Sequence, residues 1–175
     1  MIAQLFIILA GIFATIVVVS FFLPSKIVFE RSLTIQADIK SVFSYVNDLT
    51  YWQTWSAWSK FNDHSIICTF NAKHTGKGAV MHWKGKKLGK GKMELTGSKP
   101  NKNLESELYF NNSGFRIFYQ FIFTELADGT HVQWIASGKM RRFGIAKWIA
   151  LMLPRWMGRD MEIGLQLLKQ LAENK

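Results

Sequence analysis

The sequence is poor in cysteine and in acidic side chains, which supply ligands in many metal sites and groups in many catalytic centres. It has one cysteine, Cys68, so no internal disulfide and no cysteine-based metal site can form. Its histidines show no metal-ligand spacing with one another or with a carboxylate: His64, His74, His82 and His131. We therefore expect no metal, no cofactor and no catalytic residue that a motif would identify.

The scarcity of acidic residues gives the chain a strong positive charge. There are 22 lysines and arginines against 12 acids, a net charge of +10. Between Lys73 and Lys102 stand nine lysines and a single acid, Glu94. Such a stretch favours an anionic partner, such as lipid headgroups or nucleic acid, unless it is only a solvated loop face.

Aromatic residues and methionine, in contrast, are abundant. The chain has 14 phenylalanines, 7 tryptophans and 7 methionines in 175 residues. That composition predicts a folded domain with a core. About 150 residues outside a membrane segment suffice for one such domain and are too few for two.

The first long segment, Ile2 to Leu23, contains no charged residue. As a helix it spans about 33 Å, enough for the apolar core of a bilayer, and Pro24 then ends it. A cleaved signal peptide is the alternative, but no lysine or arginine precedes the run and no small-x-small site follows it. We therefore predict a transmembrane anchor over 1–24 and a folded domain over 25–175.

The positive residues around this segment predict its orientation. Lys26, Arg31 and Lys40 follow the segment, and no lysine or arginine precedes it. By the positive-inside rule, a single-pass membrane protein with this pattern carries its domain on the cytoplasmic side.

The domain begins with the pattern of one strand and two helices. Apolar and polar residues alternate from Ile27 to Ile35, as they do in a strand. Asp38 is typical of a helix N-cap, and apolar residues recur at helical spacing after it. Trp52, Trp55 and Trp58 indicate a short helical turn with an aromatic face.

The middle of the domain has the pattern of a sheet. Short alternating runs predict six strands, at about 65–71, 78–84, 90–97, 103–111, 115–126 and 130–139. Every connection is of hairpin length, so the sheet should be an antiparallel meander. After Arg142 a helical pattern returns, which Pro154 should split in two. The second piece carries an apolar stripe of Met157, Met161, Leu165 and Leu168.

This order predicts an α+β fold of the helix-grip kind. A curved seven-stranded antiparallel sheet would surround one long C-terminal helix, preceded by the N-terminal transmembrane helix. Such a sheet cannot close fully on the helix, so we expect a gap between them in which an apolar ligand would lie.

Several stretches of the domain resemble one known group of proteins. They are Arg31–Ile35 running into Ala37–Phe43, Val46–Leu49, Trp52–Trp58, Gly76–Trp83 and Gly129–Trp134. In this order they resemble the SRPBCC superfamily of START/Bet v 1-like helix-grip domains, and more narrowly its bacterial polyketide cyclase/dehydrase-like members with an N-terminal membrane anchor. The resemblance covers nearly everything after Pro24 and implies a cavity for a hydrophobic ligand. It does not imply cyclase activity, because the superfamily holds mostly binding proteins and scattered enzymes.

Apolar side chains of the predicted strands and of the last helix are the candidates for lining that cavity. They alternate along three strands: Phe115, Ile117, Tyr119, Phe121 and Phe123; Val132, Trp134 and Ala136; Ala79, Met81 and Trp83. Core packing explains most of them. The candidate ligand-binding set is Trp55, Met81, Trp83, Phe121, Trp134, Met157, Met161 and Leu165.

Three functions remain open on this fold. The first is a membrane-anchored binding domain for a lipid or other hydrophobic small molecule, with the membrane as a second partner and no nucleic acid. The second is a cyclase- or aromatase-like enzyme in which a polar cavity group, such as His82 or Tyr119, would do acid–base work. The third is an accessory protein that docks an anionic partner and binds no ligand. A cavity with titratable groups favours the enzyme, a dry cavity the binding domain, and a filled core the third.

The segment from Lys139 to Arg159 mixes basic residues with tryptophan and bulky aliphatic residues. That composition suits either a helix lying in a membrane interface or the lid of a soluble pocket. In the second case Pro154 would be the hinge, and Met161 would lie at a partly wet pocket mouth as a gate.

Overall fold

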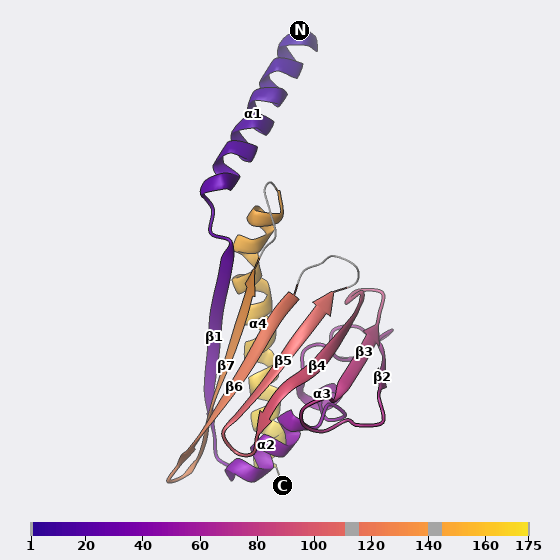
Figure 1. Cartoon of the computed structure of the whole chain (residues 1–175), viewed down its shortest axis with the longest axis vertical. Coiled ribbons are helices and arrows are strands. Elements are labelled where there is room, and N and C mark those ends of the chain that lie inside the picture. The colour runs from indigo at the N-terminus through magenta and orange to yellow at the C-terminus, as the bar shows by residue number, and fades with distance from the viewer. Residues whose placement is uncertain (1, 111–115, 140–144, 175) are drawn as a thin grey trace.

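The structure, a computed structural model, describes residues 2–110, 116–139 and 145–174. Its first element is α1 (Ile2–Phe22), which projects away from the rest of the molecule (Figure 1). Nearly all of α1 is exposed, and it is long and apolar enough to cross a membrane. Its hydroxyl groups bond within the helix, since Thr15 Oγ1 donates to Gly11 O at 2.9 Å and Ser20 Oγ to Val17 O at 2.6 Å.

Among the described residues, seven antiparallel strands form one curved sheet in the order β1-β7-β6-β5-β4-β3-β2. The strands are β1 (Lys26–Ile35), β2 (Ile67–Phe70), β3 (Val80–Lys84), β4 (Lys90–Lys99), β5 (Asn103–Phe110), β6 (Arg116–Leu126) and β7 (Gly129–Lys139). Neighbours from β2 to β7 follow one another in sequence, which confirms the predicted meander. Strand β1 adds to the β7 edge, with Lys26 opposite Lys139 and Ile35 opposite Thr130.

Strand β2 is shorter than the predicted 65–71 because a turn occupies its beginning. The backbone N–H and the hydroxyl of Ser65 both donate to Asp63 Oδ1, at 3.0 and 2.6 Å. These bonds hold Ser65 in the turn, so the strand begins only at Ile67. The predicted turn at 111–114 and the inward position of Phe115 lie outside the described residues.

The two short helices lie where the sequence predicts them. Helix α2 (Ile39–Asn47) has Asp38 as its N-cap, whose carboxylate accepts from Lys40 N and Ser41 N at 3.0 Å each. Helix α3 (Trp52–Trp55) is fastened to α2 by two buried indoles. Trp52 Nε1 donates to the carbonyl of Val46 at 2.8 Å, and Trp55 Nε1 to that of Tyr45 at 3.1 Å.

The C-terminal helix, α4 (Ile145–Glu173), continues through Pro154, so the predicted split at this residue is wrong. A proline inside a helix removes one backbone hydrogen bond. Packing on both sides of Pro154 holds the helix together, since Leu153 and Met157 both contact the core. The helix therefore has no break about which its first half could swing as a lid.

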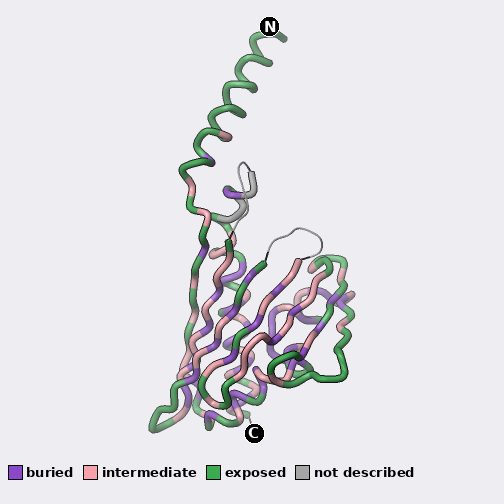
Figure 2. The backbone as a smooth tube through the Cα atoms, viewed as in Figure 1, coloured by how far each residue is buried: buried purple, intermediate pink, exposed green. Residues whose placement is uncertain are grey.

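The core lies between the concave face of the sheet and α4, as Figure 2 shows by the buried positions alternating along the strands. The predicted stripe of α4 faces this core: Met157, Met161, Leu165 and Leu168. Gly164 permits the close approach, because a Cβ there would lie 3.3 Å from the Trp134 ring and 3.6 Å from the Trp55 ring. The predicted helix-grip fold is confirmed.

Candidate functional site

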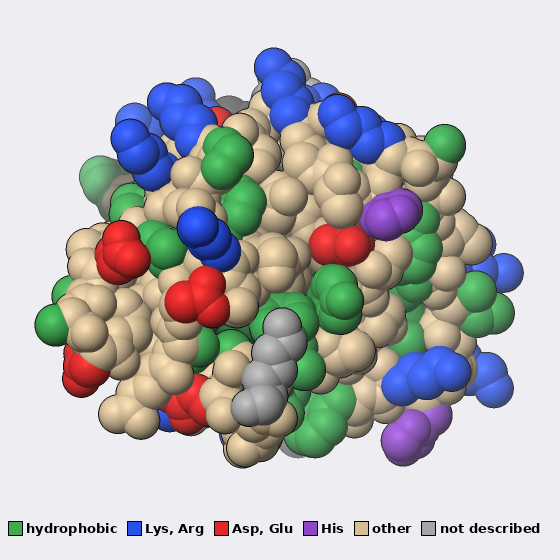
Figure 3. Space-filling view, turned by 90° about the horizontal axis from the view of Figure 1, so that it is seen from below, with side chains coloured by type: hydrophobic (Ala, Val, Ile, Leu, Met, Phe, Trp, Pro, Cys, Tyr) green, Lys and Arg blue, Asp and Glu red, His purple; other side chains and the backbone are tan. Residues whose placement is uncertain are grey.

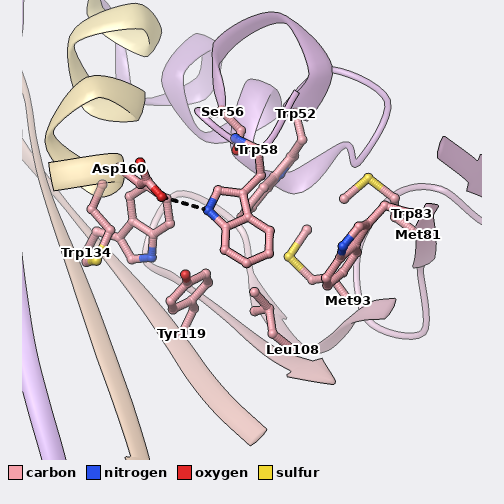
Figure 4. A pocket seen from close by; sticks show the side chains of 11 residues that line it. Trp52, Ser56, Trp58, Met81, Trp83, Met93, Leu108, Tyr119, Trp134 and Asp160 are labelled. Carbon is pink, nitrogen blue, oxygen red and sulfur yellow. Dashed lines mark hydrogen bonds between the residues drawn. The ribbon is translucent and has the colours of Figure 1, made fainter. Parts of the chain in front are cut away.

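An apolar cavity lies at one end of the core, between the segment 52–58, the five successive strands β3 to β7 and α4 (Figure 4). Its lining residues are Trp52, Ser56, Trp58, Met81, Trp83, Met93, Leu108, Tyr119, Trp134, Asp160 and Met161. The sheet supplies most of the wall, because inward positions recur every second residue along β3 to β7. Helix α4 supplies Asp160 and Met161, and the chain around α3 closes the top.

The side chains fill most of this cavity. The empty space between the lining atoms is about 430 Å³ when the open mouth of the cavity is included. Only about 20 Å³ of that space can hold the centre of a water molecule. About one water fits in that volume. A larger ligand therefore requires side chains to move, and the methionines in the wall are the most adaptable of them.

Aromatic rings form the rigid part of the wall. Trp58 packs edge-to-face on Trp83 with ring centres 5.5 Å apart, and Tyr119 packs the same way on Trp134 at 5.1 Å. Gly91 on β4 makes room for this arrangement, since a Cβ there would lie 2.3 Å from the Trp83 ring. The wall thus offers flat, apolar surfaces that suit a planar or aliphatic ligand body.

Asp160 places a carboxyl group at the edge of this apolar wall. Its Oδ2 accepts a hydrogen bond of 3.2 Å from Trp58 Nε1, drawn as the dashed line in Figure 4. Burial raises the pKa of Asp160, while the Trp58 hydrogen bond and the positive charges of Lys87 and Arg159 oppose that rise. A carboxyl group balanced in this way can change protonation state when a ligand excludes more water.

Two further polar groups accompany Asp160 at the same end. Trp134 Nε1 is buried and has no hydrogen-bond partner among the described residues. The Tyr119 hydroxyl points toward Asp160 and Trp58 in Figure 4. Burial raises the pKa of Tyr119 far above its usual value, and the negative charge of Asp160 raises it further, so the hydroxyl stays protonated. We call Tyr119, Trp134 and Asp160 the polar end of the cavity.

The β3–β4 hairpin lies beside the cavity and is fixed by a buried carboxylate. Asp63 Oδ2 accepts from the backbone N–H groups of Lys87 and Leu88 at 2.7 and 3.0 Å. Hydrogen bonds from the Ser65 hydroxyl and from Leu88 N hold the pKa of Asp63 well below its usual range. Trp83 Nε1 donates to the Leu88 carbonyl at 3.3 Å, which ties the hairpin to the cavity wall.

Only half of the residues predicted to bind a ligand line the cavity. Those that line it are Met81, Trp83, Trp134 and Met161. The others lie elsewhere in the buried core: Trp55, Phe121, Met157 and Leu165. Met161 is 1% exposed, so its predicted place at a partly wet mouth is wrong. It lies on the floor of the cavity because the stripe of α4 turns it toward the sheet.

The fold also brings in several lining residues that were not among the predicted set: Trp52, Ser56, Trp58, Met93, Leu108 and Asp160. Asp160 was the easiest of these to predict, since it directly precedes Met161, a residue of the α4 stripe that faces the core. Its partner Trp58 lies 102 positions earlier in the chain, a proximity that no local pattern contains.

The remaining polar candidates lie outside the cavity. His82 is exposed and alternates with the inward Met81 and Trp83, so it is not the polar cavity group that the enzyme alternative needs. His131 contacts Thr34 Oγ1 at 3.3 Å between β7 and β1. Burial raises the pKa of the Cys68 thiol, which makes it a weak nucleophile. Within the described ranges, no three metal-ligating side chains come together.

A helix-grip sheet with an apolar cavity against its C-terminal helix defines the class of this protein, and a family model agrees with it. The model of polyketide cyclase / dehydrase and lipid transport proteins matches residues 26–173. The chain belongs to this family, as the resemblance in its sequence implied. A search of curated proteins found no match.

Solved structures share the fold at low sequence identity. Protein CV1439 from Chromobacterium violaceum is 15% identical with a TM-score of 0.60, covering 86% of this chain and 98% of its own. Protein SA2116 from Staphylococcus aureus, of unknown function, is 11% identical with a TM-score of 0.65, covering 85% and 94%. StfQ, a di-domain ARO/CYC protein of the steffimycin biosynthetic pathway, is 10% identical with a TM-score of 0.66, covering 89% of this chain and 52% of StfQ. At these identities the likeness concerns the fold.

Proposed function

We propose that this protein is a membrane-anchored domain that binds a small hydrophobic molecule carrying one polar group. The observation that supports this function best is the cavity itself, whose wall is aromatic and aliphatic and whose polar groups gather at one end. Sites for small molecules have this composition, with a mostly apolar wall and a few polar groups that fix orientation. The match to a family described as including lipid transport supports the same class of ligand.

The polar end favours a ligand with a neutral hydroxyl group. The unpartnered Trp134 N–H can donate a hydrogen bond to a ligand, and the carboxylate of Asp160 can accept one. A ligand hydroxyl group can accept the first bond and donate the second. A cationic ligand suits the site less well, because Lys87 and Arg159 already bring positive charge to Asp160. The apolar body would displace the three cavity methionines, Met81, Met93 and Met161, from their positions.

Helix α1 supports the membrane part of the proposal. It has 21 residues and meets the length and composition of a single transmembrane span, although a signal sequence would meet them as well. The lack of a small-x-small site after α1 favours the anchor. Lys26, Arg31 and Lys40 after the span favour the cytoplasmic side for the domain.

The test compares two ligands that differ by one hydroxyl group, naphthalene and 2-naphthol. The full chain in nanodiscs is titrated by calorimetry, and the heats into protein-free nanodiscs are subtracted. We expect tighter binding of 2-naphthol. Trp134→Phe should weaken it by about fivefold, the worth of one hydrogen bond, and leave naphthalene unchanged. Trp148→Phe, an indole outside the cavity, is the matched control. No binding above the protein-free discs for either ligand would refute the function.

A cyclase- or aromatase-like enzyme is the second candidate, and one observation favours it. Asp160, with its raised pKa, lies at the cavity beside Tyr119, an arrangement that can donate or accept a proton. The name of StfQ and the family description point the same way. If this is the function, a linear polyketide incubated with the protein gives a cyclised product of lower mass by one water. Asp160→Asn should then abolish that product and leave the binding of 2-naphthol measurable.

A further inference from the structure

The first half of α4 presents an apolar stripe to the outside of the molecule. Trp148, Met152 and Trp156 are spaced four residues apart, and their exposed fractions are 37%, 45% and 53%. Leu151 beside them is 49% exposed. Residues four apart share one face of a helix. Met157 and Met161 already bury the opposite face in the core, so the stripe faces away from the domain, and Trp148 at its start bonds to α1.

Basic residues flank the stripe. Arg155 and Arg159 are exposed and continue a second row from Leu151, again at a spacing of four. A helix that combines tryptophan and bulky aliphatic residues with arginine is typical of a membrane interface. Its arginines can reach the headgroups while the apolar side chains enter the acyl boundary.

The contacts between α4 and α1 fix where this stripe lies relative to the membrane span. Lys147 Nζ donates to the carbonyl of Leu23 at 2.8 Å, and Trp148 Nε1 to that of Ile16 at 3.4 Å. Ile16 precedes the end of α1 by six residues, which is about 9 Å along a helix. If α1 crosses a bilayer, Trp148 therefore lies at the depth of the interface, where tryptophan concentrates in membrane proteins.

Strand register brings a row of positive charges to the same end of the domain. The pairings Lys26–Lys139, Tyr109–Arg116 and Lys84–Lys90 all lie at the strand ends nearest α1 (Figure 1). All five of the basic side chains in this row are exposed: Lys26, Lys84, Lys90, Arg116 and Lys139. We call this row, with the first half of α4, the basic end. The opposite end, seen in Figure 3, mixes acidic with basic side chains.

We propose that the basic end lies on the bilayer that α1 crosses and binds anionic lipid headgroups, with Trp148, Met152 and Trp156 entering the interface. Charge selects this occupant over a second copy of the chain, because two basic ends facing each other would repel. Continuity with α1 selects it over a soluble partner, since the span holds this surface against the membrane. The proposal does not depend on what the cavity binds.

The test measures depth in the full chain, reconstituted in vesicles with and without anionic lipid. In a Cys68→Ser background, a single nitroxide is attached at Met152→Cys or, as the matched control, at Asp128→Cys in the β6–β7 turn of the opposite end. Accessibility to oxygen and to a water-soluble nickel complex is then measured by power saturation. We expect the label at 152 to be more accessible to oxygen, and to move deeper when anionic lipid is present. The label at 128 should be more accessible to nickel in both vesicles.

Two outcomes would overturn the proposal. An aqueous pattern at 152 in both kinds of vesicle, equal to the pattern at 128, would show that the stripe lies in water. Dipolar broadening at 152 without oxygen accessibility would show that a second copy covers it. A variant with Lys84 and Lys90 changed to Gln separates the two parts of the surface. It should reduce the effect of anionic lipid on depth and leave the label at 152 oxygen-accessible.

Discussion

Asp160 places a carboxyl group against the Trp58 indole in a wall that is otherwise largely apolar. Its pKa in the folded protein is raised, chiefly by burial, above the unfolded value of about 3.9. Its contribution to stability is therefore complete below that pH and is lost as the pH rises through the folded-state pKa. A group that costs stability at neutral pH and lies in a cavity is expected where function requires it.

Asp160→Asn should therefore raise the melting temperature at pH 7 and have little effect at a pH below about 3.9, where the carboxyl group is protonated in both states. The amide oxygen can still accept from Trp58 Nε1, so the hydrogen bond is kept. Thermal melts of the two proteins across this pH range measure the difference. Asp128→Asn, an exposed acid in a turn, is the control. A variant less stable than the wild type at pH 7 would contradict the assignment of burial as the main cause.

Met161 provides the second prediction at this scale. At the partly wet pocket mouth that the sequence predicted for Met161, a Met161→Asp substitution would leave the fold intact, because the carboxylate could stay solvated. Its 1% exposure reverses that expectation. An unpaired charge there, next to Asp160, should cost about 3–5 kcal/mol in the free energy of unfolding. Met161→Leu, which keeps the volume, should cost less than about 1.5 kcal/mol. Denaturant unfolding measures both, and similar values for the two would mean that the cavity floor is wet.

At the scale of elements, the β3–β4 hairpin is held chiefly by one side chain outside it. Asp63 accepts from the N–H groups of Lys87 and Leu88 in the turn, and Gly85 leaves room for its carboxylate, since a Cβ there would lie 2.3 Å from Asp63 Oδ2. The pKa of Asp63 is lowered in the folded protein. The stability it contributes is therefore present above its unfolded pKa of about 3.9 and is lost as the pH falls toward the folded value.

We expect Asp63→Asn to loosen this hairpin, because an amide oxygen cannot replace all the bonds that the carboxylate accepts. Amide hydrogen exchange should lose protection at Lys87 and Leu88 first, with the central strands β6 and β7 unchanged. The melting temperature should fall at pH 7, and the gap to the wild type should close in acid. Loss of protection spread evenly over the sheet would show instead that Asp63 supports the whole fold.

The elements differ in how far the sequence determines them. The six central strands were predictable because glycine, asparagine, aspartate and proline mark their turns. The continuity of α4 through Pro154 was not, since packing of Leu153 and Met157 on distant strands overrides a local signal. The polar end of the cavity was unpredictable for a related reason. It joins Tyr119, Trp134 and Asp160 from three separate elements, and their proximity is visible only in three dimensions.

At the scale of the whole molecule, the residue counts show that the chain is positively charged, but they do not show where on the molecule that charge lies. The antiparallel order of the strands determines how the charge is distributed, because successive hairpins lie alternately at the end of the sheet near α1 and at the opposite end (Figure 1). Lys84 and Lys90 thereby join Lys26 and Lys139, although they are far apart in sequence. Lys99 and Lys102, of the same lysine-rich stretch, fall at the other end. The stretch from Lys73 to Lys102 is therefore divided between two ends.

Deletion of residues 1–24 should release a folded domain into the soluble fraction at high salt. The family match begins at residue 26, and the strands and helices of the domain are complete without α1. Circular dichroism checks folding, and sedimentation with membranes checks release. An unfolded product would place the domain boundary elsewhere, and sedimentation that persists at high salt would show that α1 is not the main attachment.

At low salt the same truncated domain should bind anionic vesicles through its basic end. Replacing five hairpin lysines with Gln should weaken that binding by about 1 kcal/mol for each lysine near the surface: Lys84, Lys86, Lys87, Lys90 and Lys92. Lys92 should contribute least, because it already pairs with Glu94 at 3.2 Å and lies over the Tyr109 ring. Lys99→Gln with Lys102→Gln is the matched control, since it removes the same kind of charge from the opposite end. Vesicle flotation measures each affinity. If the control pair weakens binding as much per lysine as the hairpin set does, net charge rather than the basic end attracts the domain to the membrane.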